Sequence, residues 1–330
     1  MSNKRLSMIK DPPNMRANGD PRFLSLFLKR KKRFAAVLYR DRYLLLLFLI
    51  PLAYYAVFHY WPMYGVQIAF KDFRVAKGIS GSNWVGLKHF INFLNDSYFW
   101  QLVRNTLTLN LLNILFGFPA PIILALLLNE VSSYPYKRFI QTVSYLPHFI
   151  STVVVVGMIV NALSTNGPVN ALLNMFGTKS IPFMIRPEWF RLIYVGSGIW
   201  QGVGWGSIIY LASLTSVNPE VYEAALIDGA NRMQRIVHVN IPAMVPTITV
   251  MFILAVGNIL GIAFEKVLLL YNPMTYATSD VIQTFIYRRG LLDVDFSYAT
   301  AVGVFQSFIG IILLSTTNYL SRRVSEVSLW

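Results

Sequence analysis

The sequence has no cysteine and few charged residues. The absence of cysteine excludes disulfides, thiolate nucleophiles and thiolate metal sites. The four histidines, His59, His89, His148 and His238, are far apart in the chain, so we expect no metal centre. Charged residues make up 13% of the 330 positions, whereas a typical soluble domain has about 25%. So few charges cannot cover a large globule with a hydrated surface, so most of the outer face is expected to contact lipid.

Long apolar runs take the place of the missing charges. Hydrophobic residues make up 55% of the chain and the mean hydropathy is +0.49. Windows of about 19 residues detect runs long enough to cross a hydrocarbon core about 30 Å thick. Six such runs occur, at 43–61, 106–128, 139–163, 192–214, 241–262 and 298–319. We predict an all-α integral membrane protein with six transmembrane helices, because lipid offers the backbone no hydrogen-bond partner and strand-like alternation is absent.

The basic residues are concentrated at the N-terminus. Lysine and arginine number 29 against 15 acids, a net charge of +14, and 12 of the 29 lie between Lys4 and Arg42. This distribution predicts a basic cytoplasmic segment at 1–42, a six-helix membrane domain at 43–320 and a short cytoplasmic tail at 321–330. An even number of spans places both termini in the cytoplasm, with 18 basic residues inside and 11 outside. Residues 21–40 suit a helix lying on an anionic leaflet, and an unstructured charged tail is an equal alternative.

The predicted inner loop at 217–240 contains the most informative motif. Residues 218–229 read NPEVYEAALIDG and predict a short helix. Asn218 is a good N-cap, Pro219 suits the first helical position and Glu220 favours the positive end of the helix dipole. Gly229 can adopt the left-handed conformation that ends a helix. We expect a capped cytosolic helix, followed by a second helical segment that enters the next span at Pro242.

These residues carry a resemblance to a known family. Glu223, Ala224 and Ala225, then Gly229, then the Val239-x-Ile241-Pro242 segment resemble the EAA signature of permease subunits in binding-protein-dependent ABC importers. The spacing matches throughout, with valine and isoleucine in place of isoleucine and leucine. The chain from residue 43 to 330 is similar to the carbohydrate, maltose-type branch, and most similar to oligosaccharide and polysaccharide permeases of the alginate type. Segments 125–130, 280–290 and 328–330 add to the resemblance.

The resemblance implies a fold, a set of partners and a mechanism. The fold would be the type I ABC importer permease fold. In that family the EAA helix docks on a cytosolic ATPase subunit and transmits ATP-driven closure to the membrane helices. The implied partners are a second related permease, two ATP-binding cassette subunits that hold ATP and magnesium, and an extracytoplasmic solute-binding protein. The coupling residues would be Glu223, Ala224, Ala225, Asp228, Gly229, Arg232 and Pro242. The alternative is a solvated cytosolic helix without a partner.

The chain itself is not expected to be an enzyme. It has no complete Walker motif, since Gly177 to Ser180 resemble only the tail of one. We therefore predict a permease subunit of a bacterial inner-membrane importer for oligosaccharides or polysaccharides. One alternative is a permease of the same scaffold for peptides or another solute, which transport assays would distinguish. The other is an ion-coupled carrier, although the spans contain almost none of the ionisable residues that such carriers use.

Candidate residues for the substrate path lie in the middle spans. Trp200, Gln201 and Trp205 occur in the glycine-rich fourth run, where aromatic faces and an amide would suit a sugar. Close helix packing through glycine, with aromatic residues filling gaps, explains the same run equally well. Asn258 in the fifth run is a further candidate. For His148, which follows Pro147 in the third run, we favour a kink with a satisfied buried hydrogen bond over a role in the pathway.

Overall fold

The computed structural model describes residues 40–257, 261 and 263–325 of the chain. Most of the basic segment 1–42, its proposed interfacial helix, Asn258 and the last five residues therefore lie outside the described residues. The described chain is mainly helical and contains one antiparallel pair of short strands, β1 (Lys71–Asp72) and β2 (Asn83–Trp84). It divides into two compact units, Met1–Gly65 and Val66–Trp330.

The described part of the first unit is an exposed apolar helix. Helix α2 (Arg42–Tyr55) continues into a π-helical turn, η1 (Ala56–Tyr60). No side chain of α2 is buried within the chain, although most of them are apolar. A helix that is apolar on all sides suits lipid or another apolar partner. The helical segment that begins with α2 extends to Phe70 and is long and apolar enough to cross a membrane, which agrees with the first predicted span.

The second unit contains the remaining helices. Their bounds are η2 (Trp61–Phe70), which begins in the first unit, η3 (Val75–Lys77), α3 (Gly78–Gly81), α4 (Lys88–Leu94), α5 (Phe99–Leu112), η4 (Asn113–Gly117), α6 (Pro119–Asn129), α7 (Tyr134–Tyr145), η5 (Leu146–Phe149), α8 (Thr152–Leu163), α9 (Pro168–Met175), η6 (Phe183–Ile185), α10 (Pro187–Thr215), α11 (Pro219–Ile227), α12 (Arg232–Arg235), η7 (Ile236–Asn240), α13 (Ile241–Gly257), α14 (Phe264–Leu270), η8 (Pro273–Thr275), α15 (Tyr276–Ser279), α16 (Ile282–Tyr287), η9 (Arg288–Leu292) and α17 (Phe296–Ser325).

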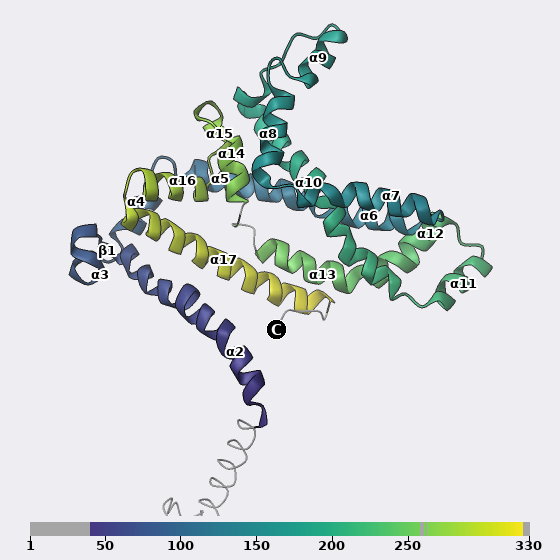
Figure 1. Ribbon diagram of the computed structural model, residues 1–330, viewed down its shortest axis with the longest axis horizontal. Helices are drawn as coiled ribbons and strands as arrows, with labels where there is room; N and C mark the ends of the chain where they lie inside the picture. The colour runs from purple at the N-terminus through teal and green to yellow at the C-terminus, as the bar shows by residue number, and fades with distance from the viewer. Residues whose placement is uncertain (1–39, 258–260, 262, 326–330) are drawn as a thin grey trace, which may run out of the picture. The chain divides into compact units, whose positions relative to one another are not determined.

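Helix α10 is the central element of this unit. It packs along α6 and α7 and contacts α13, and α13 in turn lies beside α17 (Figure 1). Ala125, Tyr210, Leu214 and Met244 form a buried cluster where α6, α10 and α13 meet. A fully buried aliphatic or aromatic side chain stabilises a fold by about 1.5–3 kcal/mol. This cluster therefore holds α6, α10 and α13 together.

Two glycines of α10 permit its closest helix contacts. A Cβ atom at Gly204 would overlap the backbone carbonyl of Ser144 in α7. A Cβ atom at Gly206 would lie 3.0 Å from Cγ of Pro121 in α6. Small residues allow backbones to approach in this way. The packing explanation for the glycine-rich run is therefore confirmed at these two positions.

The predicted span at 139–163, for which we expected a kink after Pro147, is divided into two separate helices. Helix α7 ends at Tyr145, η5 follows, and the chain is extended at Ile150 and Ser151 before α8 begins. Proline at 147 cannot donate to the helical hydrogen-bond ladder, and the Ser151 hydroxyl caps α8 by accepting from the Val154 amide. Helix α7 packs on α10, whereas α8 packs on α14, so the two halves of the apolar run belong to different layers (Figure 1).

Among the residues that the structure describes, five helical segments are long and apolar enough to cross a membrane. They are Arg42–Phe70, Phe99–Asn129, Thr152–Met175, Arg232–Gly257 and Phe296–Tyr319. Four of them overlap the first, second, fifth and sixth predicted runs, and Thr152–Met175 contains the second half of the third. The fourth predicted run lies inside the 29-residue helix α10, which is not among the five. Six spans, with both termini in the cytoplasm, therefore remain a prediction.

A buried polar network stabilises the end of the unit opposite α11. The Asp280 carboxylate is 1% exposed and accepts from Arg288 Nη2 at 2.6 Å and from the Thr284 hydroxyl at 2.8 Å. The Asn105 amide of α5 donates to the Asp280 carbonyl at 3.1 Å. Because a buried charge needs both an opposite charge and hydrogen bonds, this network fixes α16 against α5.

Candidate coupling helix and pocket

Helix α11 is defined at both ends by its own sequence. The Asn218 side chain accepts from the Glu220 amide at 3.0 Å, and Pro219 is the first helical residue. At the other end Gly229 has φ +74°, in the left-handed region. The Ala230 amide donates to the Ala225 carbonyl at 2.9 Å and the Gly229 amide to the Leu226 carbonyl at 3.1 Å. This is a Schellman cap, so the predicted start and end of the helix are confirmed.

The segment after α11 is also capped. Helix α12 begins with a capping box in which the Asn231 side chain accepts from the Gln234 amide and the Gln234 side chain accepts from the Asn231 amide, at 2.9 and 2.7 Å. Helical structure then continues through η7 into α13, which contains Pro242. Arg232 is the first residue of α12. A short capped helix and a helical connection to the next span are therefore present, as expected.

Tyr222 connects α11 to two other helices. Its hydroxyl accepts from Asn129 Nδ2, at the end of α6, at 3.0 Å. The same hydroxyl donates to Asn240 Oδ1, directly before α13. A second connection lies beside it, where Arg235 of α12 forms an ion pair with Glu130 at 3.7 Å and both side chains are 16% exposed. These contacts attach the α11–α12 segment to α6 and to α13.

The outer face of α11 has no cover from the described residues. Glu223, Ala224, Leu226, Ile227 and Asp228 are all exposed, and no residue of the helix is buried. Ile227 is 87% exposed. An isolated nine-residue helix is marginal in water, so its caps and its Tyr222 anchor are needed to hold it in place. The result is a fixed helix that presents alanine, leucine, isoleucine and two carboxylates outward.

Two candidates for the substrate path, Trp205 and Gln201, contact the segment between α7 and α8. The Trp205 ring stacks on the His148 ring, with centroids 4.6 Å apart and an interplanar angle of 1°. His148 is exposed, so the expected buried hydrogen bond is wrong, and the ring instead packs on an aromatic face. The Gln201 amide donates to the Ile150 carbonyl at 3.2 Å, which satisfies an acceptor at the break. Trp200 is 45% exposed.

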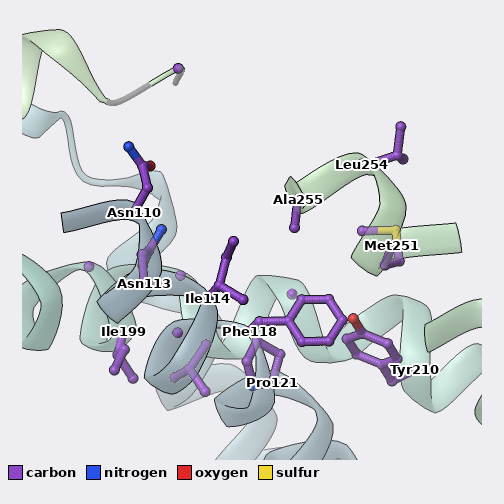
Figure 2. Close-up of a pocket in the computed structure, with 16 residues that line it drawn as sticks. Asn110, Asn113, Ile114, Phe118, Pro121, Ile199, Tyr210, Met251, Leu254 and Ala255 are labelled. Carbon is purple, nitrogen blue, oxygen red and sulfur yellow. The ribbon is translucent and has the colours of Figure 1, made fainter. Parts of the chain in front are cut away.

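A pocket of about 390 Å³ lies on another side of α10. Its walls come from α5, η4, α6, α10 and α13, and they include Gly198 and Gly202. Figure 2 shows the side chains of Asn110 and Asn113 on one side of the opening, with Met251, Leu254 and Ala255 on the other. Trp200, Gln201 and Trp205 do not line this pocket. We expected these three residues to line a polar cavity. The amides that line the pocket are instead those of Asn110 in α5 and Asn113 in η4.

Sequence reasoning missed Tyr222, Asn240, Asn110 and Asn113. Tyr222 lies inside the recognised motif, but its partner Asn129 is 93 positions away, so no local spacing links them. Glu130 lies in the segment 125–130 that adds to the family resemblance, but its ion pair with Arg235 cannot be read from the sequence. Asn110 and Asn113 lie in an apolar run. An amide side chain inside such a run was the one feature of the sequence that could have identified them as candidate pocket residues.

Comparison with known proteins identifies the family. The family described as the binding-protein-dependent transport system inner membrane component matches residues 117–326. The chain belongs to this family. The matched region covers all the elements from α6 to α17, including α11 and most of the pocket wall.

This inner-membrane component has relatives that align over almost its whole length. The polygalacturonan/rhamnogalacturonan transport system permease protein YteP of Bacillus subtilis is 42% identical over 303 residues, 92% of this chain and 94% of that protein. Protein LplB of the same organism is 43% identical over 296 residues, 89% of this chain and 93% of LplB.

Two solved structures share the fold of this permease. One is a bacterial ABC transporter involved in the import of the acidic polysaccharide alginate, with a TM-score of 0.83 and 42% identity over 89% of this chain and 99% of the matched chain. The other is a bacterial alginate ABC transporter in complex with an alginate pentasaccharide-bound periplasmic protein, with a TM-score of 0.84 and 42% identity over 90% of this chain and 100% of the matched chain. The expectation of an ABC importer permease fold is confirmed.

Proposed function

We propose that this chain is the membrane permease subunit of an ATP-driven importer for oligosaccharides or polysaccharides. The relatives support the substrate class, because their names refer to polygalacturonan, rhamnogalacturonan and alginate. The capped helix α11, exposed on one face and attached through Tyr222 on the other, carries the mechanistic part of the proposal.

The exposed face of α11 is the proposed contact for a cytosolic ATPase subunit. Its alanines permit close approach, Leu226 and Ile227 offer apolar area, and Glu223 and Asp228 are available for charged contacts. ATP and magnesium would be bound by two such subunits and not by this chain. A second, related permease and an extracytoplasmic solute-binding protein would complete the transporter.

The anchors of α11 provide a route for movement to reach the pocket. Asn129 and Glu130 end α6, and Asn240 precedes α13. The same two helices contribute pocket walls, with Pro121 from α6 and Met251 from α13. A displacement of α11 by an ATPase subunit would therefore shift both walls relative to α10. We infer that this movement alternates access to the pocket between the two sides of the membrane.

Two substitutions in the coupling segment test this mechanism. Gly229→Pro cannot adopt the observed φ of +74° and would disrupt the end of α11. Glu223→Lys reverses a charge on the proposed contact face. Each variant should abolish saccharide uptake but remain in the membrane, and each should copurify less ATPase subunit. Gly177→Pro is the control, since Gly177 has a similar φ of +78° outside the coupling segment. Unchanged uptake in both coupling variants would contradict the proposal.

A further inference from the structure

Lys266 of α14 is a buried cation without a polar partner. It is 5% exposed, and its Nζ atom has no hydrogen bond or ion pair with any described residue. Its neighbour Val267 is fully buried in an apolar cluster. Burial lowers the pKa of the Lys266 ammonium to about 8, so the group is still mainly protonated at pH 7. A buried charge without a partner is costly and therefore needs a functional explanation.

The ammonium lies beside the wall of the pocket. Nζ is 3.6 Å from the position that a Cβ atom would occupy at Gly198, a residue that lines the pocket. Gly261, five positions before Lys266, lines the same pocket. Lys266 itself does not line the pocket, and Gly198, which carries only a hydrogen atom in place of a side chain, is the residue that lies next to both the ammonium and the pocket. The ring of Tyr194 is on the same face, with its centroid 5.6 Å from Nζ.

The polar side chains that line the pocket are uncharged, and their chemistry differs from that of the nearby ammonium. None of the described residues that line the pocket is acidic or basic, and the Lys266 ammonium is a charge next to its Gly198 wall. Asn110 and Asn113 supply amides, and Tyr210 supplies a hydroxyl. Amides suit sugar hydroxyls, whereas an ammonium suits a carboxylate, with which it forms a stronger, charge-assisted hydrogen bond. Contact with the Tyr194 ring alone is a weak replacement for the water that the ammonium loses.

We propose that Lys266 and the gap at Gly198 form a subsite for the carboxylate of a uronic acid residue, while Asn110 and Asn113 bind sugar hydroxyls. This inference rests on the proposed function and narrows its substrate class to acidic saccharides. It also assigns part of the selectivity to the membrane subunit itself. A neutral saccharide of the same size would leave the ammonium without a partner in the occupied pocket.

The test is direct binding to the purified transporter, with its ATPase subunits and without a solute-binding protein. The probes are a galacturonate tetramer and its fully methyl-esterified form, which keeps the rings but has no negative charge. Lys266→Met removes the ammonium and keeps an apolar side chain of similar length. Lys179→Met is the matched control, because Lys179 is exposed and outside the pocket.

The wild type and Lys179→Met should bind the acidic tetramer with equal affinity and the ester more weakly. Lys266→Met should lose about thirtyfold or more in affinity for the acid, with little change for the ester. Lys266→Arg should retain part of the preference for the acid, which would exclude general misfolding as the cause. Equal loss for both probes, no loss, or no binding by the wild type would each overturn the inference. ATP-dependent uptake of a saccharide by the wild type would still support the proposed function in those cases.

Discussion

Removing one oxygen atom from Tyr222 should loosen the attachment of α11 to α6 and α13. Tyr222→Phe deletes the hydroxyl that accepts from Asn129 and donates to Asn240. Asn240 is fully buried and its Nδ2 atom has no hydrogen-bond partner among the described residues, so the change would leave its Oδ1 atom unsatisfied as well. An unsatisfied buried acceptor costs about 1–3 kcal/mol, and Asn129, which is partly exposed, can replace its bond with water. We expect a loss of about 2 kcal/mol, or about thirtyfold in the equilibrium between attached and detached helix.

Amide hydrogen exchange measures this equilibrium directly. Exchange of the backbone amides in α11 should accelerate by about thirtyfold in Tyr222→Phe, because local opening controls exchange in marginal elements. Amides in α10 should be unaffected, and saccharide uptake should fall. Tyr136→Phe is the control, since Tyr136 is exposed and no hydrogen bond of its hydroxyl is observed among the described residues. Exchange in α11 that changes less than about threefold would refute the idea that Tyr222 anchors the helix.

Three further predictions concern the ion pair, the helix packing and the orientation. Arg235→Glu replaces the ion pair at the 3.7 Å contact with two carboxylates, whose repulsion of about 1–4 kcal/mol should reduce uptake. Adding Glu130→Arg should restore uptake, and a double variant without restored uptake would argue against the ion pair. Gly204→Ala should destabilise the detergent-solubilised protein by about 1–3 kcal/mol in thermal unfolding, whereas Gly196→Ala, which meets no atom within 4 Å, should not. Because the chain lacks cysteine, Ile227→Cys gives a unique site for labelling in membranes that contain this chain without its ATPase subunits. An impermeant maleimide should react in inside-out vesicles only, and labelling from outside the cell would contradict the predicted topology.

The parts of the site that follow from local interactions were predictable from the sequence. Asn218, Pro219 and Gly229 define α11 through contacts within a few residues, and the structure confirms each of them. Apolar runs of sufficient length likewise identify membrane-spanning helices, because the thickness of the hydrocarbon core sets the length that such a helix needs. Averaging hydropathy over a window of residues conceals a single break in an apolar run. The residues at 139–163 were therefore predicted as one span, although Pro147 and Ser151 could have indicated the break.

The connections between these elements depend on how the helices pack. Tyr222 contacts Asn129 across 93 positions and Asn240 across 18, and neither separation has a period that sequence reasoning can detect. In the sequence, Lys266 cannot be distinguished from an ordinary lysine of a loop. The fold buries it beside Gly198. Capping and helix length depend on residues that are close together in the sequence. The Tyr222 contacts and the pocket form only when segments that are far apart in the sequence pack against one another.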